Sequence, residues 1–256
     1  MESASQTGSK EGLADGAGND AIVACEDLSR CFGEGDTSVD ALTRVSLKFP
    51  PGELTAIVGP SGSGKSTLMH LLAGLDRPSG GHCWIDGVEV TGLDDQRLTE
   101  LRRDKLGFIF QFFNLVPVLT AEENITLPLR IAGRKPDNEW LEKLLDTVGI
   151  ADRRTHRPSE LSGGQQQRVA VARALITRPA VVFADEPTGN LDSTSSADVL
   201  ELLRRSVDDF GQTAIMVTHD PRSASYADRV IGLVDGEISA DRRVGSVDEV
   251  IDLMRT

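Results

Sequence analysis

Three short runs of hydrophobic residues recur along the chain, each bounded by turn residues or charges. They lie at residues 54–58, 180–184 and 213–217. Runs of this length without polar alternation are typical of strands buried on both faces of a parallel sheet. Apolar residues with helical spacing occupy three further segments, at 68–75, 141–148 and 199–210. Because strands then alternate with helices along the chain, the pattern predicts an α/β fold.

The first ninety residues carry a different pattern. Val45, Leu47 and Phe49 alternate with polar residues, as in a strand with one buried face. In the run 84–90, Asp86-Gly87 separates two segments with high β propensity, which is typical of a tight hairpin. The sequence therefore predicts an antiparallel sheet in this part of the chain.

Composition divides the chain into a tail and a globular domain. Residues 1–20 are rich in Gly, Ser, Ala and acidic residues and have little to bury, so we expect a disordered tail. Residues 21–256 are expected to form the domain. Within it, residues 94–177 lie between the first two buried strands and are mainly of helix and loop character, which predicts a helical subdomain inserted in the core.

The charge balance limits the possible partners. The chain has 27 Lys and Arg residues against 40 Asp and Glu residues, a net charge of −13. This charge attracts neither a nucleic-acid backbone nor an anionic membrane surface, so we expect no nucleic-acid partner and a local site for any bound anion. The longest uncharged stretch, Leu106 to Ala121, is shorter than the about 20 residues of a membrane-spanning helix. The N-terminus lacks the features of a secretory signal, which predicts a cytoplasmic protein.

A glycine-rich segment follows the first buried strand and leads into a helical pattern, which is the context of a phosphate-binding P-loop. Its candidate nucleotide-binding residues are Gly59, Pro60, Ser61, Gly62, Ser63, Gly64, Lys65, Ser66 and Thr67. Backbone N–H groups and the helix N-terminus would surround the phosphates, Lys65 would reach the β- and γ-phosphates, and the Ser66 hydroxyl would ligate Mg²⁺. The alternative is a simple strand-to-helix turn, and the strand and helix on its two sides favour the P-loop.

The second buried strand ends in two acidic residues, Asp185 and Glu186. Asp185 is a candidate to hold Mg²⁺ through water, as P-loop NTPases require. Glu186 lies one residue beyond the strand and is placed to polarise the water that attacks the γ-phosphate. A pair of acids that merely ends a strand is the alternative, and the P-loop favours the catalytic interpretation.

Residues 161–168, Leu-Ser-Gly-Gly-Gln-Gln-Gln-Arg, resemble the signature motif of ATP-binding cassette (ABC) ATPases. The resemblance implies a P-loop NTPase fold with a RecA-like parallel-sheet core, an antiparallel β subdomain and an α-helical subdomain. Ser162 and two glycines would begin a helix through about Leu175, which makes a second phosphate site unless Ser162 is only an ordinary N-cap.

In the family, two such chains form a homodimer with ATP between the P-loop of one and the signature motif of the other. The residues that would act on the nucleotide of the partner chain are Ser162, Gly163, Gly164, Gln165 and Asp192.

Four further positions take their roles from the resemblance. Gln111 resembles the glutamine that contacts Mg²⁺ and the attacking water, and His219 resembles the switch histidine at the γ-phosphate. Asp192 belongs to a D-loop in which Gly189-Asn190 replaces the more widespread Ser-Ala. Phe32 occupies the place of the tyrosine that stacks on adenine, with a core position as the alternative.

The sequences of segments 119–129 and 185–193 are similar to those of one branch of the family, which includes lipoprotein-releasing, macrolide- and peptide-exporting and cell-division ATPases. This implies an ATP-hydrolysing subunit, with ATP and Mg²⁺, that drives a separate membrane permease for export or extraction at the inner face of the cell membrane. One alternative is a membrane signalling complex of the cell-division type that moves no solute. A soluble DNA-repair or translation ATPase is disfavoured by the acidic charge and the lack of coiled-coil insertions.

The uncharged stretch near Gln111 holds four of the eight phenylalanines, which suggests an exposed surface for another protein. They are Phe108, Phe110, Phe112 and Phe113. In the family, the coupling helix of the permease docks in this region, so we expect the permease to dock near Gln111 and Phe112.

Overall fold

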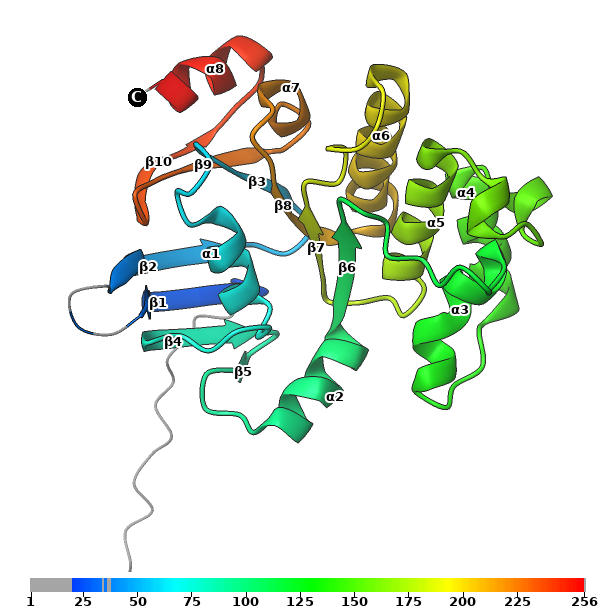
Figure 1. The fold of residues 1–256 in the computed structure, drawn as a ribbon, viewed down its shortest axis with the longest axis horizontal. Helices are drawn as coiled ribbons and strands as arrows, with labels where there is room; N and C mark the ends of the chain where they lie inside the picture. The colour runs from blue at the N-terminus through cyan, green and yellow to red at the C-terminus, as the bar shows by residue number, and fades with distance from the viewer. Residues whose placement is uncertain (1–19, 34, 36–37, 256) are drawn as a thin grey trace, which may run out of the picture.

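The computed structural model, which describes residues 20–33, 35 and 38–255, contains two β-sheets. The predicted tail, residues 1–20, lies outside the described residues except for Asp20. The sheets and the helices around them give the α/β architecture of Figure 1. The α/β prediction is therefore confirmed.

The smaller sheet is antiparallel and has the strand order β2-β1-β4-β5. Its strands are β1 (Val23–Phe32), β2 (Val39–Phe49), β4 (Gly80–Ile85) and β5 (Val88–Glu89). Val45, Leu47 and Phe49 are buried, and the polar residues between them are exposed. The predicted antiparallel sheet and its hairpin at Asp86-Gly87 are thus confirmed.

The larger sheet has the order β10-β9-β3-β8-β7-β6 and is parallel except for β10. Its strands are β3 (Leu54–Val58), β6 (Leu106–Phe110), β7 (Val181–Asp185), β8 (Thr213–Val217), β9 (Arg229–Val234) and β10 (Glu237–Arg243). The three predicted runs become β3, β7 and β8, which are buried almost throughout because helices or the second sheet cover both faces.

Eight α-helices lie in the described part of the chain. They are α1 (Lys65–Leu72), α2 (Asp95–Lys105), α3 (Ala121–Ile131), α4 (Asn138–Val148), α5 (Gly163–Leu175), α6 (Ser193–Phe210), α7 (Pro221–Ala224) and α8 (Val247–Arg255). Two short 3₁₀ turns, η2 (Ala151–Arg153) and η3 (Pro158–Glu160), precede α5.

The helices divide the hydrophobic core into two clusters. Helix α1 packs against strands of both sheets and fills one cluster between them. The other cluster covers the opposite face of the large sheet with residues of α3 to α8. Figure 1 shows α3, α4 and α5 together on the side of the molecule away from the small sheet.

The segment 94–177 contains α2, α3, α4 and α5, as its helical character predicts, and it also contains β6. This strand pairs in parallel with β7 and forms one edge of the large sheet. Because β6 belongs to the core sheet, the boundaries of the inserted helical subdomain stay a prediction.

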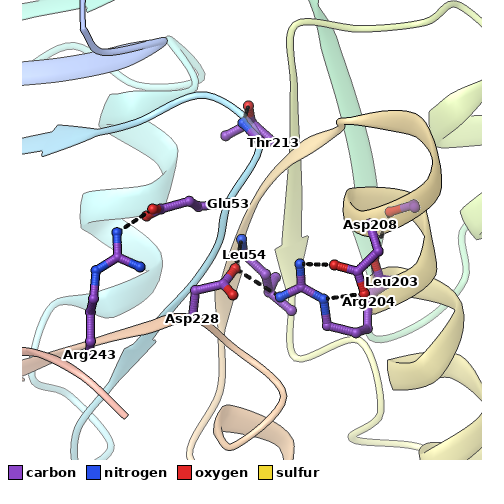
Figure 2. Close-up of polar contacts among 10 residues, drawn as sticks. Glu53, Leu54, Leu203, Arg204, Asp208, Thr213, Asp228 and Arg243 are labelled. Carbon is purple, nitrogen blue, oxygen red and sulfur yellow. Dashed lines mark hydrogen bonds and ion pairs between the residues drawn. The ribbon is translucent and has the colours of Figure 1, made fainter. Parts of the chain in front are cut away.

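A polar network holds together the amino ends of the parallel strands (Figure 2). Arg204 of α6 donates to Asp228 Oδ2 at 2.8 Å, and the same oxygen accepts the backbone N–H of Leu54 at the start of β3. Next to it, Arg243 of β10 forms an ion pair with Glu53. The network anchors the amino ends of the strands, and the site lies at their carboxyl ends.

Candidate functional site

The P-loop lies between the end of β3 and the start of α1. Gly64 has φ of 100°, and a Cβ at this position would lie 2.4 Å from the carbonyl oxygen of Ala41. Only glycine therefore fits, because both the backbone conformation and the close approach exclude a side chain. Ser63 Oγ is buried without a hydrogen-bond partner among the described residues, so a hydroxyl group is left for a bound anion.

Lys65 is buried in this loop. Its Nζ donates to the carbonyl oxygens of Gly59 and Pro60 at 2.9 and 2.8 Å. Burial lowers the pKa of Lys65, and the nearby carboxylates of Glu186 and Asp185 act in the opposite direction. A cation held this way is poorly solvated and is well placed to exchange carbonyl oxygens for phosphate oxygens.

Ser66 and Asp185 lie close enough to share a cation, with Ser66 Oγ 3.5 Å from Asp185 Oδ1. Hydroxyl and carboxylate oxygens are ligands that Mg²⁺ prefers, and Mg²⁺ usually takes only one or two protein ligands beside substrate phosphates. The described residues contain no group of three or more His, Cys, Asp or Glu side chains fit for a metal. As a hydroxyl and a carboxylate, Ser66 and Asp185 suit Mg²⁺ that is bound together with phosphates.

Glu186 and His219 meet at the ends of neighbouring strands. Asp185 of β7 pairs in register with Val217 of β8, and the next residues of the chain continue to Glu186 and His219. His219 Nδ1 lies 2.8 Å from Glu186 Oε1. Both side chains line a cavity of about 590 Å³. The structure thus brings together two predicted catalytic residues that are 33 positions apart in sequence.

Gln111 follows β6 at the same edge of the sheet, where Phe110 pairs in register with Asp185. In the described part of the chain, the Gln111 side chain forms no hydrogen bond with Ser66 or Asp185. Instead, Gln111 Nε2 donates to Asn190 Oδ1 at 3.2 Å.

Ser162 is the N-cap of α5, which is the alternative that the sequence left open for this residue. Its Oγ accepts from Gln165 N at 3.2 Å, and Gln165 Oε1 accepts from Ser162 N at 2.9 Å, so the two residues form a capping box. In Figure 1, α5 and α1 lie on different sides of β7 and β6. The signature residues are therefore apart from the P-loop of their own chain.

Asp192 caps α6 by accepting the backbone N–H groups of Thr194 and Ser195, each at 3.0 Å. The bonds from the backbone and hydroxyl of Ser195 lower the pKa of Asp192. The carboxylate is therefore ionised and fixed at the start of α6.

Phe32 ends β1 with 43% of its surface exposed, so it lies outside the hydrophobic core. The Arg30 guanidinium covers one face of its ring at 4.6 Å from the centroid. This geometry suits a ring that stacks with a planar cationic or heterocyclic group.

The phenylalanine-rich segment is partly a strand. Phe108 and Phe110 are half-buried on β6, and Phe113 is also half-buried. Phe112 is 73% exposed. The expectation of an exposed apolar loop therefore holds at Phe112. Phe108 and Phe110 belong instead to β6, the strand at one side of the large sheet.

Sequence reasoning missed two amides that connect these elements. Gln167 of α5 is fully buried, and its Nε2 donates to Phe110 O at 3.2 Å and to Pro187 O at 2.5 Å. The other is Asn190, which bonds Gln111 in both directions. For Asn190 the only signal in the sequence is the departure from Ser-Ala in the D-loop.

Known proteins are similar to this chain in sequence and fold. The model of the ABC transporter family matches residues 42–189. The chain is 40% identical to the uncharacterized ABC transporter ATP-binding protein MJ0796 of Methanocaldococcus jannaschii over 234 residues, which is 89% of this chain and all of that protein. It is also 48% identical to the macrolide export ATP-binding/permease protein MacB of Marinobacter nauticus over 222 residues, 86% of this chain.

The chain spans about a third of that MacB relative, or 34% of its length. Among solved structures, the dimer of MJ0796 bound to ADP and Pi matches with a TM-score of 0.78 and 40% identity. The match covers 87% of this chain and 98% of that one. The likeness thus extends to the whole of an isolated cassette.

The charge on Asp185 gives a prediction for stability. Burial raises the pKa of Asp185, and Glu186 acts in the same direction, so the ionised side chain costs folding free energy above that raised pKa. We expect Asp185→Asn to raise the Tm of the nucleotide-free protein at pH 7, by about 2–4 °C for each kcal/mol recovered. The gain should shrink as the pH falls through the folded-state pKa, because the wild-type carboxyl then becomes neutral too.

Thermal unfolding at pH 7 and at pH 4 measures this difference. The control is Asp146→Asn, which removes an exposed carboxylate of α4. A Tm of Asp185→Asn below the wild-type value at pH 7, or a gain that is equal at both pH values, would contradict the argument.

Proposed function

The chain belongs to the ABC transporter family, and from this premise we propose that it is the ATP-hydrolysing subunit of an exporter that drives a separate membrane permease. The observation that carries the proposal is the convergence of Lys65, Asp185, Glu186 and His219 at one edge of the sheet. These are side chains of the kinds that binding and cleavage of a nucleoside triphosphate require.

The residues have distinct roles in this reaction. Lys65 and the N–H groups of its loop bind the β- and γ-phosphates. Ser66, Asp185 and Gln111 would hold Mg²⁺, which when bound neutralises charge on the phosphate oxygens. Glu186 accepts a proton from water as the water oxygen bonds the γ-phosphorus and the bond to the bridging oxygen of ADP breaks. His219, 2.8 Å from Glu186, orients that carboxylate and would contact the γ-phosphate.

A second copy of the chain would complete the nucleotide-binding site. The first N–H groups of α5 have no partner within the helix, and they lie apart from the P-loop of the same chain. The MJ0796 relative is a dimer with ADP and Pi, which supports a homodimer here. We place Ser162, Gly163, Gly164, Gln165 and Asp192 on the nucleotide of the partner, and Phe32 beside the adenine ring.

A groove beside β6 suits the permease. It has a volume of about 410 Å³, and its walls come from β6 and from the helices around it, with Phe108, Phe110, Asn114, Pro128 and Arg173 among the lining residues. Exposed Phe112 follows the strand that forms one wall. The groove combines these apolar residues with Arg102, Arg103 and Arg173, and a helix docked there would lie close enough to Gln111 to act on a nucleotide-binding residue.

In the part of the chain that the structure describes, no helix has the length and apolar character of a membrane span. The MacB relatives are named for macrolide export and as ATP-binding/permease proteins, which favours export or extraction over a signalling role for this chain. The match to all of MJ0796, which is named an ABC transporter ATP-binding protein, supports an ATP-binding subunit that acts on a permease. The subunit would then lie at the inner face of the membrane, bound through that permease.

We expect Glu186→Gln to lower ATP hydrolysis by at least about 100-fold, because it removes the base and keeps the size of the side chain. ATP binding should survive, and a dimer should accumulate with ATP and Mg²⁺. Phosphate release and gel filtration measure the two effects. Glu201→Gln, at an exposed position of α6, is the matched control. Hydrolysis by Glu186→Gln near the wild-type rate would refute the role of Glu186.

The docking site is tested with Phe112→Asp. A charge in place of this exposed apolar ring beside the groove should reduce the recovery of a membrane partner by about 30-fold, the scale of an interface hot spot. The ATPase activity of the isolated subunit should stay within about twofold of wild type.

The assay is co-purification from detergent-solubilised membranes of the native cell, with mass spectrometry of the retained membrane proteins. Val39→Asp is the control, since Val39 is 63% exposed on β2, in the small sheet. Equal recovery of the same membrane protein by Phe112→Asp and wild type would exclude this surface.

A further inference from the structure

Asn190 and Gln111 are joined by two hydrogen bonds that run in opposite directions. Gln111 Nε2 donates to Asn190 Oδ1 at 3.2 Å. Asn190 Nδ2 donates to the backbone carbonyl oxygen of Gln111 at 3.0 Å. The two residues are 79 positions apart, so this pair connects the end of β6 to the loop that follows β7.

The chemistry of the two bonds fixes the orientation of both amides. A backbone carbonyl only accepts, so the Asn190 atom that faces Gln111 O must be the nitrogen. This places Asn190 Oδ1 toward the side chain of Gln111, and an amide oxygen also only accepts. The end of Gln111 that faces Asn190 is therefore Nε2, and Oε1 points to the other side. Among the described residues, none donates a hydrogen bond to Gln111 Oε1.

Gly189 provides the space for this pair. A Cβ at Gly189 would lie 2.8 Å from Gln111 Nε2, which is closer than real side-chain carbons come, and in a tight contact of 3.0 Å with Gln111 Cδ. Both departures from the widespread Ser-Ala sequence therefore serve the same contact. Glycine leaves room for the Gln111 side chain, and asparagine binds it.

The loop that contacts Gln111 is folded by two turns of its own, directly after β7. Gly189 N donates to Glu186 O at 3.0 Å, and Leu191 N donates to Thr188 O at 3.1 Å. Asn190 is exposed, so its contact with Gln111 contributes little to the hydrophobic core. Its side chain is used instead to fix a neighbour.

We propose that Asn190 is a positioning residue that turns the Gln111 amide so that Oε1, and not Nε2, is offered to Mg²⁺ and the attacking water. The proposal rests on the proposed function, in which Gln111 is a ligand of Mg²⁺. Asn190 acts only through Gln111. Its loss should therefore weaken the use of Mg²⁺ and leave the binding of metal-free nucleotide unchanged.

The test is a double-mutant cycle with Asn190→Ala, Gln111→Ala and the double variant. Two readouts are used: the Mg²⁺ concentration that gives half-maximal ATP hydrolysis, and the affinity for ADP by calorimetry with Mg²⁺ and with EDTA. We expect Asn190→Ala to raise the half-maximal Mg²⁺ concentration and to weaken ADP binding in Mg²⁺ by about 3- to 10-fold, with unchanged affinity in EDTA. In the Gln111→Ala background, Asn190→Ala should add less than about 1.5-fold.

Two further variants separate positioning from stability. Gly189→Ala should reproduce the effect of Asn190→Ala, because its Cβ displaces Gln111. Asn138→Ala changes an exposed asparagine of α4 and should match wild type in both readouts.

The outcomes distinguish this proposal from the proposed function. A wild-type chain without Mg²⁺-dependent hydrolysis overturns both. A wild-type chain that hydrolyses ATP normally, with Asn190→Ala equal to it, overturns the role of Asn190 alone. The same conclusion follows if Gln111→Ala equals wild type, or if Asn190→Ala has an undiminished effect in the Gln111→Ala background.

Discussion

The parallel register of four neighbouring strands, β3, β8, β7 and β6, is the constraint on which the site depends. It places the carboxyl ends of these strands side by side at one edge of the sheet. The P-loop follows β3, His219 follows β8, the Asp185-Glu186 pair ends β7, and Gln111 follows β6. Ligands bind at this edge in open α/β sheets because loops and helix N-termini converge there. The polar network around Arg204 and Asp228 secures the opposite edge, so the two ends of the sheet serve separate purposes.

Within this edge the charges are held in poorly solvated positions. Burial lowers the pKa of Lys65 and raises the pKa of Asp185, so each charged group is less well solvated in the site than in water. Bound phosphates and a cation would supply the missing partners. The buried hydroxyl of Ser63, which has no hydrogen-bond partner in the described part of the chain, would gain a partner in the same way. Groups held in this way stabilise charge during the reaction with little rearrangement beyond the exchange of oxygen partners at Lys65.

The sequence was sufficient for features that are local. Continuous apolar runs predicted β3, β7 and β8, the Asp86-Gly87 turn predicted the β4–β5 hairpin, and the motif at 161–168 predicted the family that the comparisons confirm. It did not reveal β6, because the uncharged stretch continues past Phe110 to Ala121 and nothing in it marks where the strand ends. The contacts of Gln167 and Asn190 join segments far apart in sequence, so only the folded chain brings them together. The roles of the site residues on a bound nucleotide remain proposals.

The central claim is that one nucleotide site is made from two chains. A direct test uses two variants in a chain whose Cys25, Cys31 and Cys83 are replaced, with Glu186→Gln to hold the closed state. One variant carries Ser61→Cys and the other Ser162→Cys, and the two are mixed with a short bifunctional thiol crosslinker. A direct disulfide would need Cα atoms within about 7 Å, so the crosslinker is the fairer probe. We predict a crosslinked dimer that requires both variants, ATP and Mg²⁺. A dimer that forms equally without ATP, or no crosslink at all, would contradict the composite site.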